Sequence, residues 1–284
     1  MRKLLILFLF GLIFTLAGCN GKDYYCKNKP FDESCYLPMD DLEFEPTEKE
    51  EFTINENFED EALNQKPRNW LLYSNEEYKA NGVRAVVAEG ENGKFVKMYS
   101  DGAWAPMYPQ NAPTPTFIFT TKFNLDKARK GVAYASVMLP AEDELPEEDT
   151  YNSVTVGVAT GAVNTISVTI GKDLKIFGKV GGPFFYHSGN NDSGDTFVTS
   201  HTAELDTWYR FKFVWDAEEN LVQAFLIVDE EEELLYSGKF HISNRYNAEE
   251  DGEILVPNVF KVTMPRYSKG WAFLDEVKVE RRNK

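Results

Sequence analysis

From about residue 54 onward, short runs rich in β-branched and aromatic residues alternate with clusters of Gly, Pro, Asn and Asp. Such runs are typical of β-strands, and such clusters are typical of turns. No stretch shows the period of a long amphipathic helix. The strands that this pattern predicts are residues 85–88, 95–99, 116–123, 132–139, 153–160, 165–170, 174–178, 196–200, 208–216, 221–228, 233–239, 258–264 and 272–280.

The clearest alternation lies in residues 208–216, where Tyr, Phe, Phe and Trp occupy every second position from 209 to 215. Successive side chains of a strand point to opposite faces, so this segment is predicted to have one aromatic, core-facing side. Turn residues separate it from 221–228 and 233–239, and we expect the three segments to form an antiparallel meander. Many short strands without helices predict an all-β fold of two packed antiparallel sheets, because one open sheet would leave long edges exposed.

Residues 1–18 have the pattern of a cleaved secretion signal: two basic residues, an apolar run and small residues before Cys19. The apolar run, 4–16, is shorter than the ~20 residues that a membrane-spanning helix needs. A tetrad begins at the last residue of this run and reads Leu16-Ala17-Gly18-Cys19. It resembles the lipobox of bacterial lipoproteins. The resemblance implies that Cys19 carries acyl chains such as palmitate and anchors an extracytoplasmic protein to the cell membrane or outer membrane. An ordinary secretory signal with an incidental cysteine is the alternative.

The other two cysteines, Cys26 and Cys35, follow Cys19 closely. Outside the cytoplasm, two such thiols predict a disulfide that closes a small loop. The segment around them, 19–53, is polar and acidic, contains three prolines and has neither a helical nor a strand period. We interpret it as an extended tether that holds a single β-sandwich domain, 54–284, away from the membrane.

Acidic residues outnumber basic ones by 46 to 30, which gives a formal net charge of −16. Loss of Arg2 and Lys3 with the signal would bring that charge to −18. This balance argues against nucleic acid as a partner, because proteins that bind it present a basic face.

The two ends of the 54–284 domain carry motifs that belong together. The first end contains Asn-Phe-Glu-Asp-Glu at 57–61 and Trp70, and the last end reads Gly-Trp-Ala-Phe-Leu-Asp-Glu-Val-Lys-Val at 270–279. With Thr-Trp-Tyr-Arg-Phe at 207–211, they resemble the concanavalin A-like, or laminin-G-like, jelly-roll sandwiches and related carbohydrate-binding modules. The resemblance implies a jelly-roll sandwich in which the opening strand lies beside the closing strand.

The same resemblance implies a structural calcium ion between the terminal strands, as many of these relatives have. Carried over to this sequence, its ligands would be Glu59 or Asp60 together with Asp275. Calcium prefers carboxylate and carbonyl oxygens, so the residue types are suitable. The alternative is that Asp275 caps an edge strand and the opening carboxylates are solvated.

Catalytic motifs of sandwich enzymes are incomplete in this sequence. Hydrolases of this fold place three carboxylates on one strand, whereas the only comparable string, Glu204-Leu205-Asp206, lacks the third. We therefore expect Glu204 and Asp206 to lie in the turn before 208–216. A lyase would need a Tyr or His base near a neutralising side chain; Tyr186, His187 and His201 are present without an Arg-rich strand. No catalytic residue is assigned.

Two loops have compositions that suit carbohydrate binding. Trp104 and Tyr108 lie among prolines in 101–111, and Tyr186, His187 and Asn190 lie in 181–192. Sugar rings stack on aromatic faces, while amides satisfy their hydroxyl groups. The alternative is that these aromatics cover a sheet edge. The leading hypothesis is an anchored lipoprotein that displays a carbohydrate-binding sandwich; a polysaccharide lyase or glycoside hydrolase, and a structural envelope lipoprotein, remain alternatives.

Overall fold

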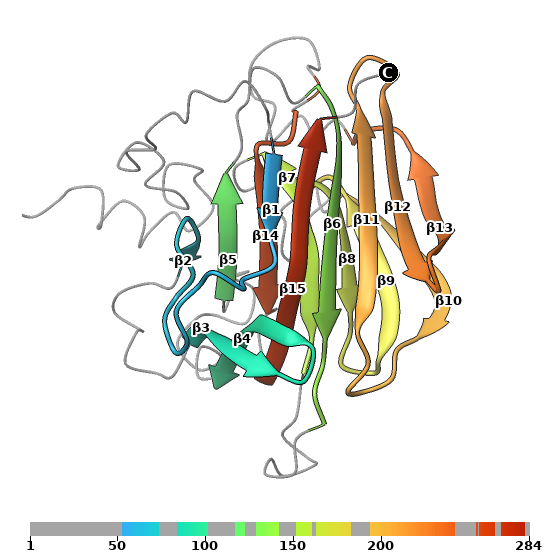
Figure 1. Ribbon diagram of the computed structural model, residues 1–284. Helices are drawn as coiled ribbons and strands as arrows, with labels where there is room; N and C mark the ends of the chain where they lie inside the picture. Colours follow the sequence, from blue (N-terminus) through green and yellow to red (C-terminus); the bar gives the residue numbers. More distant parts are fainter. Residues whose placement is uncertain are drawn as a thin grey trace, which may run out of the picture. The chain divides into compact units, whose positions relative to one another are not determined.

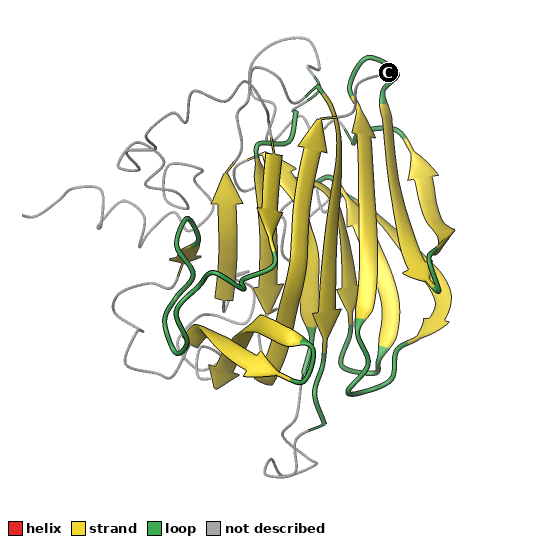
Figure 2. Cartoon of the chain, viewed as in Figure 1, coloured by secondary structure: helices red, strands yellow, loops and turns green. Residues whose placement is uncertain are grey.

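The computed structural model of the protein describes residues 53–73, 84–101, 117–122, 129–141, 152–160, 163–182, 194–241, 254, 256–264 and 268–281. All of them belong to one unit, Pro46–Lys284. Every regular element in these ranges is a strand (Figure 2). Accordingly, they contain no helix that is long and apolar enough to cross a bilayer.

The described part of the chain contains fifteen strands (Figure 1). In chain order they are β1 (Thr53–Glu56), β2 (Leu71–Tyr73), β3 (Arg84–Gly90), β4 (Gly93–Asp101), β5 (Phe117–Lys122), β6 (Lys130–Met138), β7 (Val154–Thr160), β8 (Val163–Ile170), β9 (Lys175–Val180), β10 (Asp195–Thr202), β11 (Tyr209–Asp216), β12 (Leu221–Val228), β13 (Glu231–Gly238), β14 (Val259–Met264) and β15 (Lys269–Arg281). Every strand predicted from the sequence overlaps one of these, and β1 and β2 are additional.

The strands form two antiparallel sheets. Sheet A has the order β13-β12-β11-β6-β15-β4-β3, with β1 also paired to β15, and sheet B has the order β10-β9-β8-β7-β14-β5-β2. In Figure 1 sheet A faces the viewer and sheet B lies behind it. The chain changes sheets repeatedly, for example between β4 and β5, between β6 and β7, and between β14 and β15. This is the two-sheet jelly-roll sandwich that the sequence predicts.

The core lies between the inward faces of the two sheets. On β11, Phe211, Phe213 and Trp215 are fully buried, which confirms the predicted aromatic face. The glycine at 131 of the neighbouring strand β6 leaves room for the Trp215 ring, because a Cβ there would lie 2.1 Å from it. Sheet B contributes apolar residues such as Val156 to the same core. The predicted meander is also confirmed, since β11 pairs with β12 and β12 with β13.

The opening strand does lie beside the closing strand, as the resemblance implies. Thr53 pairs with Glu280 and Glu56 with Val277. Strand β4 uses the same side of β15 as β1 but pairs with its first half, 269–274. A bulge at Glu276, where φ is +50°, separates the two partners. One long strand therefore joins the start of the described chain to the β3–β4 hairpin.

Candidate ligand-binding surface

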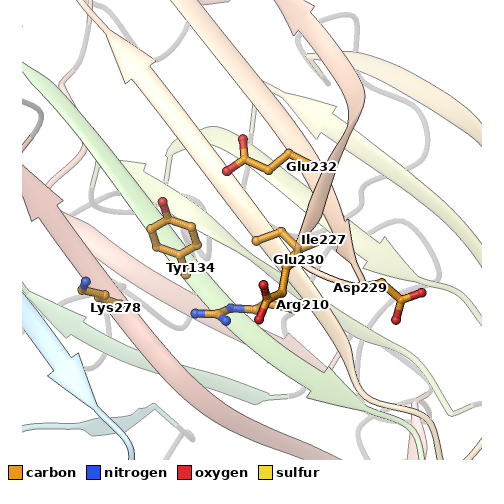
Figure 3. Close-up of a pocket in the computed structure, with 7 residues that line it drawn as sticks. All are labelled: Tyr134, Arg210, Ile227, Asp229, Glu230, Glu232 and Lys278. Atoms are coloured by element: carbon orange, nitrogen blue, oxygen red, sulfur yellow. The ribbon is translucent and has the colours of Figure 1, made fainter.

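A shallow depression of about 540 Å³ lies on the outer face of sheet A. Five strands or their connecting turns contribute to it, and Figure 3 shows that their side chains point out from the sheet around one open space. The lining residues are Tyr134, Arg210, Ile227, Asp229, Glu230, Glu232 and Lys278.

Strand register explains why these side chains share a face. Tyr134 of β6 pairs with Lys278 of β15 on one side and with Lys212 of β11 on the other. Arg210 is two residues before Lys212 and so points the same way. Its partner on β12 is Ile227. Residues from distant parts of the sequence thus meet because their strands are neighbours in the sheet.

Two cationic side chains of β11 lie near the Tyr134 ring. The Arg210 guanidinium is 5.6 Å from the ring centroid, and the Lys212 ammonium is 5.9 Å from it. Such cations are attracted to the faces of aromatic rings. These side chains place hydrogen-bond donors beside the Tyr134 ring.

Arg210 and Lys278 in the depression, and Lys212 beside it, each have a carboxylate partner. Lys212 Nζ lies 2.6 Å from Glu232 Oε2, and Lys278 Nζ lies 2.5 Å from Glu280 Oε1. The Arg210 Nε is 3.7 Å from Glu276 Oε2. The depression therefore presents both donors and acceptors without a strong net charge.

Next to the depression, five partly exposed or exposed aromatic residues form what we call the aromatic band. Tyr99 and Trp271 have ring centroids 4.6 Å apart, and Phe95 and Phe273 have centroids 4.7 Å apart. The fifth member, Trp208, is 37% exposed. The band thus consists of Phe95, Tyr99, Trp208, Trp271 and Phe273.

Trp208 connects the band to the depression. Its ring centroid is 6.0 Å from that of Phe95, in an edge-to-face arrangement. It also precedes Arg210 by two residues, so its side chain lies on the same side of the sheet. Lys97 adds a cation to the band, because its Nζ is 3.9 Å from the Trp271 centroid. Band and depression together cross β4, β15, β6, β11, β12 and β13.

The outward face of sheet B differs in both chemistry and exposure. Thr155, Thr169 and Lys261 point outward there and are buried, and the two threonine hydroxyls are 2.7 Å apart. Burial lowers the pKa of Lys179 on this face to about 8. In the described strands β7, β8, β9 and β14 there is no Asp or Glu. These four strands therefore offer no carboxylate for acid–base catalysis.

Most of the side chains assigned from the sequence lie outside the described residues. This applies to the carbohydrate-binding candidates Trp104, Tyr108, Tyr186, His187 and Asn190. It also applies to the lipidation site Cys19 and to the cysteines predicted to form a disulfide, Cys26 and Cys35. All of these remain predictions.

The residues weighed for catalysis have structural contacts. Asp206 lies in the turn before β11, where its Oδ1 accepts a hydrogen bond of 2.8 Å from the Ala141 N–H. The Glu204 N–H donates to the Tyr209 hydroxyl at 2.7 Å. Both therefore belong to the turn, as expected. His201 Nε2 lies 3.0 Å from Glu233 Oε1 of the opposite sheet.

Of the calcium candidates, Glu59 and Asp275 are close enough for their charges to interact. Burial, with the charges of Glu276 and Glu59, raises the pKa of Asp275 to about 6, although a hydrogen bond from the Glu276 N–H opposes this rise. For Asp60, the backbone carbonyl accepts a 3.5 Å hydrogen bond from the Arg68 side chain. Among the described residues, no group of three or more His, Cys, Asp and Glu side chains could hold a metal ion.

No protein-family model matches the sequence, and no curated protein matches it. A solved structure of a sialidase is similar, with a TM-score of 0.50 and 8% identity over 81% of this chain. The chain covers only 18% of that sialidase. The likeness concerns the fold alone.

Two other solved structures are less similar. Arcelin-5, a lectin-like defense protein from Phaseolus vulgaris, has a TM-score of 0.43 and 9% identity, over 82% of this chain and 99% of its own. A carbohydrate-binding module from Bacillus subtilis has a TM-score of 0.38 and 8% identity, over 75% of this chain and 95% of its own.

Proposed function

We propose that the protein is a non-catalytic module that binds an oligosaccharide on the outer face of sheet A. The observation that carries this proposal is the aromatic band beside a polar depression on one sheet face. Sugar rings stack their C–H faces on aromatic side chains, and a few placed polar groups satisfy their hydroxyls. Trp208 supplies an exposed ring where the two parts of the surface meet.

The dimensions of this surface suit a chain of several sugars. It crosses six neighbouring strands, and neighbouring strands lie ≈ 4.8 Å apart. The long axis of the surface therefore runs across the strands and covers about 24 Å between β4 and β13. A bound glycan would contact Trp271 or Phe273 in the band and Tyr134 in the depression.

Charge favours a neutral glycan over a polyanion. Arg210, Lys212 and Lys278 each have a carboxylate partner within 3.7 Å. The chain as a whole has a formal net charge of −16. An anionic ligand would have to compete with these carboxylates and approach against that charge.

A glycan array and alanine variants test the proposal. The chain carrying Cys19→Ala, which removes the proposed acylation site, would be screened and then titrated against any bound glycan. We expect Trp208→Ala to weaken binding about tenfold, which corresponds to about 1.4 kcal/mol. Val198→Ala, on sheet B and 78% exposed, is the control and should bind normally. Absence of binding to any glycan, or equal affinities of both variants, would contradict the proposal.

A lyase is the second candidate because Tyr134 and Arg210 lie side by side. Elimination needs a base and a group that neutralises a uronate carboxyl, and these two residue types can serve those roles. Incubation with acidic polysaccharides, followed by ultraviolet detection of unsaturated products, distinguishes the two functions. Cleavage that is lost in Tyr134→Phe would select the lyase.

We also propose that the protein is displayed on a membrane through lipid on Cys19, with 19–53 as the tether. The tetrad ending in Cys19 and the apolar run before it support this proposal. Two or three acyl chains anchor stably where one does not. Labelled palmitate should enter the wild-type protein but not Cys19→Ala in a bacterial host, and equal labelling of both would refute the anchor.

A further inference from the structure

A lysine of the chain holds together the turn after β1 and the start of β4. The Lys94 ammonium donates hydrogen bonds to the carbonyl oxygens of Glu59, at 2.7 Å, and Glu61, at 2.9 Å. The backbone N–H of Lys94 donates to Glu59 Oε1 at 2.7 Å. One residue of β4 therefore satisfies three oxygen atoms of a turn that lies over thirty residues earlier in the chain.

The turn is shaped so that these oxygens converge. Phe58 has φ of +59° and is 1% exposed, which fixes the turn against the core. The Glu61 N–H donates to the Phe58 carbonyl at 3.0 Å. The Glu61 carboxylate accepts hydrogen bonds from the Arg68 side chain and backbone, both at 3.2 Å. Of the Glu61 oxygen atoms, only the backbone carbonyl oxygen bonds to Lys94.

Gly93 allows the close approach of the two segments. Its φ is +123°, and a Cβ at this position would lie 2.2 Å from Glu59 Oε1. The Glu59 carboxylate thus occupies the space beside Gly93 while it accepts the Lys94 N–H. Any other residue at 93 would displace it.

These contacts do not fit the calcium ion that the fold resemblance implies. Calcium takes about six to eight oxygen ligands at 2.3–2.6 Å. Three oxygens of the turn, from Glu59 and Glu61, already accept hydrogen bonds from Lys94. Asp275 accepts one from the Glu276 N–H at 2.7 Å. In the described ranges, no further carboxylate completes a set of three.

We infer that the Lys94 ammonium takes the place of a structural calcium ion and joins the opening turn to sheet A. An ammonium supplies positive charge and three donors, two of which bond to the carbonyls. Because this cation is covalently part of the chain, it cannot be lost to a chelator. The stability of the protein is therefore independent of calcium.

Melting temperatures of the full chain test this inference. We expect the wild-type Tm to shift by less than about 1 °C on addition of excess Ca²⁺ or of EDTA, and Lys94→Met to lower it by about 4–8 °C. Lys175→Met removes a lysine that is 65% exposed and serves as the control. Lys94→Met keeps an apolar stem of similar length, so loss of the charge is isolated from loss of packing.

A rise of the wild-type Tm with Ca²⁺, or a fall with EDTA, of more than about 2 °C would overturn the inference. So would a Tm of Lys94→Met equal to that of Lys175→Met. If Lys94→Met does not fold, the wild-type measurement still decides. Lys94→Arg, which keeps the charge, should then fold with a Tm nearer the wild-type value. Glycan binding takes place on other residues, so it can fail or succeed independently.

Discussion

The ring of Phe197 on β10 stacks on the ring of Tyr236 on β13, with centroids 4.7 Å apart and planes 21° from parallel. This contact joins the edge strands of opposite sheets. Two histidine–carboxylate contacts lie at the same edge, His201 with Glu233 and His241 with Asp195. Side chains therefore join the sheets at this end, where no strand of the described ranges connects them by backbone hydrogen bonds.

Removal of either ring should weaken this closure. In a double-mutant cycle of Phe197→Ala and Tyr236→Ala, we expect a coupling energy of about 0.5–1.5 kcal/mol in urea unfolding. Val198→Ala, the exposed neighbour of Phe197, should have no coupling with Tyr236→Ala. Strictly additive effects of the two ring deletions would show that the stacking contributes nothing.

Burial of Lys179 should make stability depend on pH in the alkaline range. The pKa of this side chain is about 8 in the folded protein against 10.5 for a free lysine. The unfolded chain therefore binds more protons between these values, so the unfolding free energy should rise with pH there. Relative to Lys179→Met, the unfolding free energy of the wild type should rise by up to about 3 kcal/mol across this pH range. Parallel curves of unfolding free energy against pH for the wild type and Lys179→Met would contradict this. Lys175→Met, which removes an exposed lysine, is the control.

The glycine at position 131 should be intolerant of any side chain. A Cβ there would lie 2.1 Å from the Trp215 ring, which is fully buried. We expect Gly131→Ala to lower the unfolding free energy by about 1–3 kcal/mol in chemical denaturation. Gly90→Ala, where the nearest atom would be 3.1 Å away on the Phe95 ring, is the matched control and should lose less.

Glycan affinity should depend weakly on salt. The cations of the depression are paired with carboxylates, so a neutral ligand gains little from long-range attraction. We expect less than about a twofold change in Kd between low and high ionic strength by calorimetry. Tyr134→Ala should weaken binding at both salt concentrations, and a steep loss with salt would instead indicate an anionic ligand.

Strands could be predicted from the sequence wherever the two faces of a strand differ in polarity. In β11 the inward aromatics alternate with Arg210 and Lys212, and the structure confirms that assignment. Strands β1 and β2 have four and three residues, too few for a period to be recognised. They form because β15 and β5 provide partners, which no local pattern shows.

The binding surface was harder to predict, because aromatic residues suggest a core. In β4 the outward Phe95 and Tyr99 alternate with the buried Val96 and Met98, so both faces are apolar and the sequence does not distinguish them. The depression depends on register between five strands and has no local motif at all. An outward lysine between two aromatics, as in Phe95-Val96-Lys97-Met98-Tyr99, was the one signal for the band.

The pairing of β1 with β15 has a mechanical consequence. Thr53 lies opposite Glu280, whereas Trp271 of the aromatic band lies near the other end of β15. A pull on the segment before residue 53, resisted by a ligand held near Trp271, would act along the strands in opposite directions. The four residue pairs between β1 and β15 would then share the load in shear. A chain held at its N-terminal side would in this way resist a pull without β1 unzipping from β15.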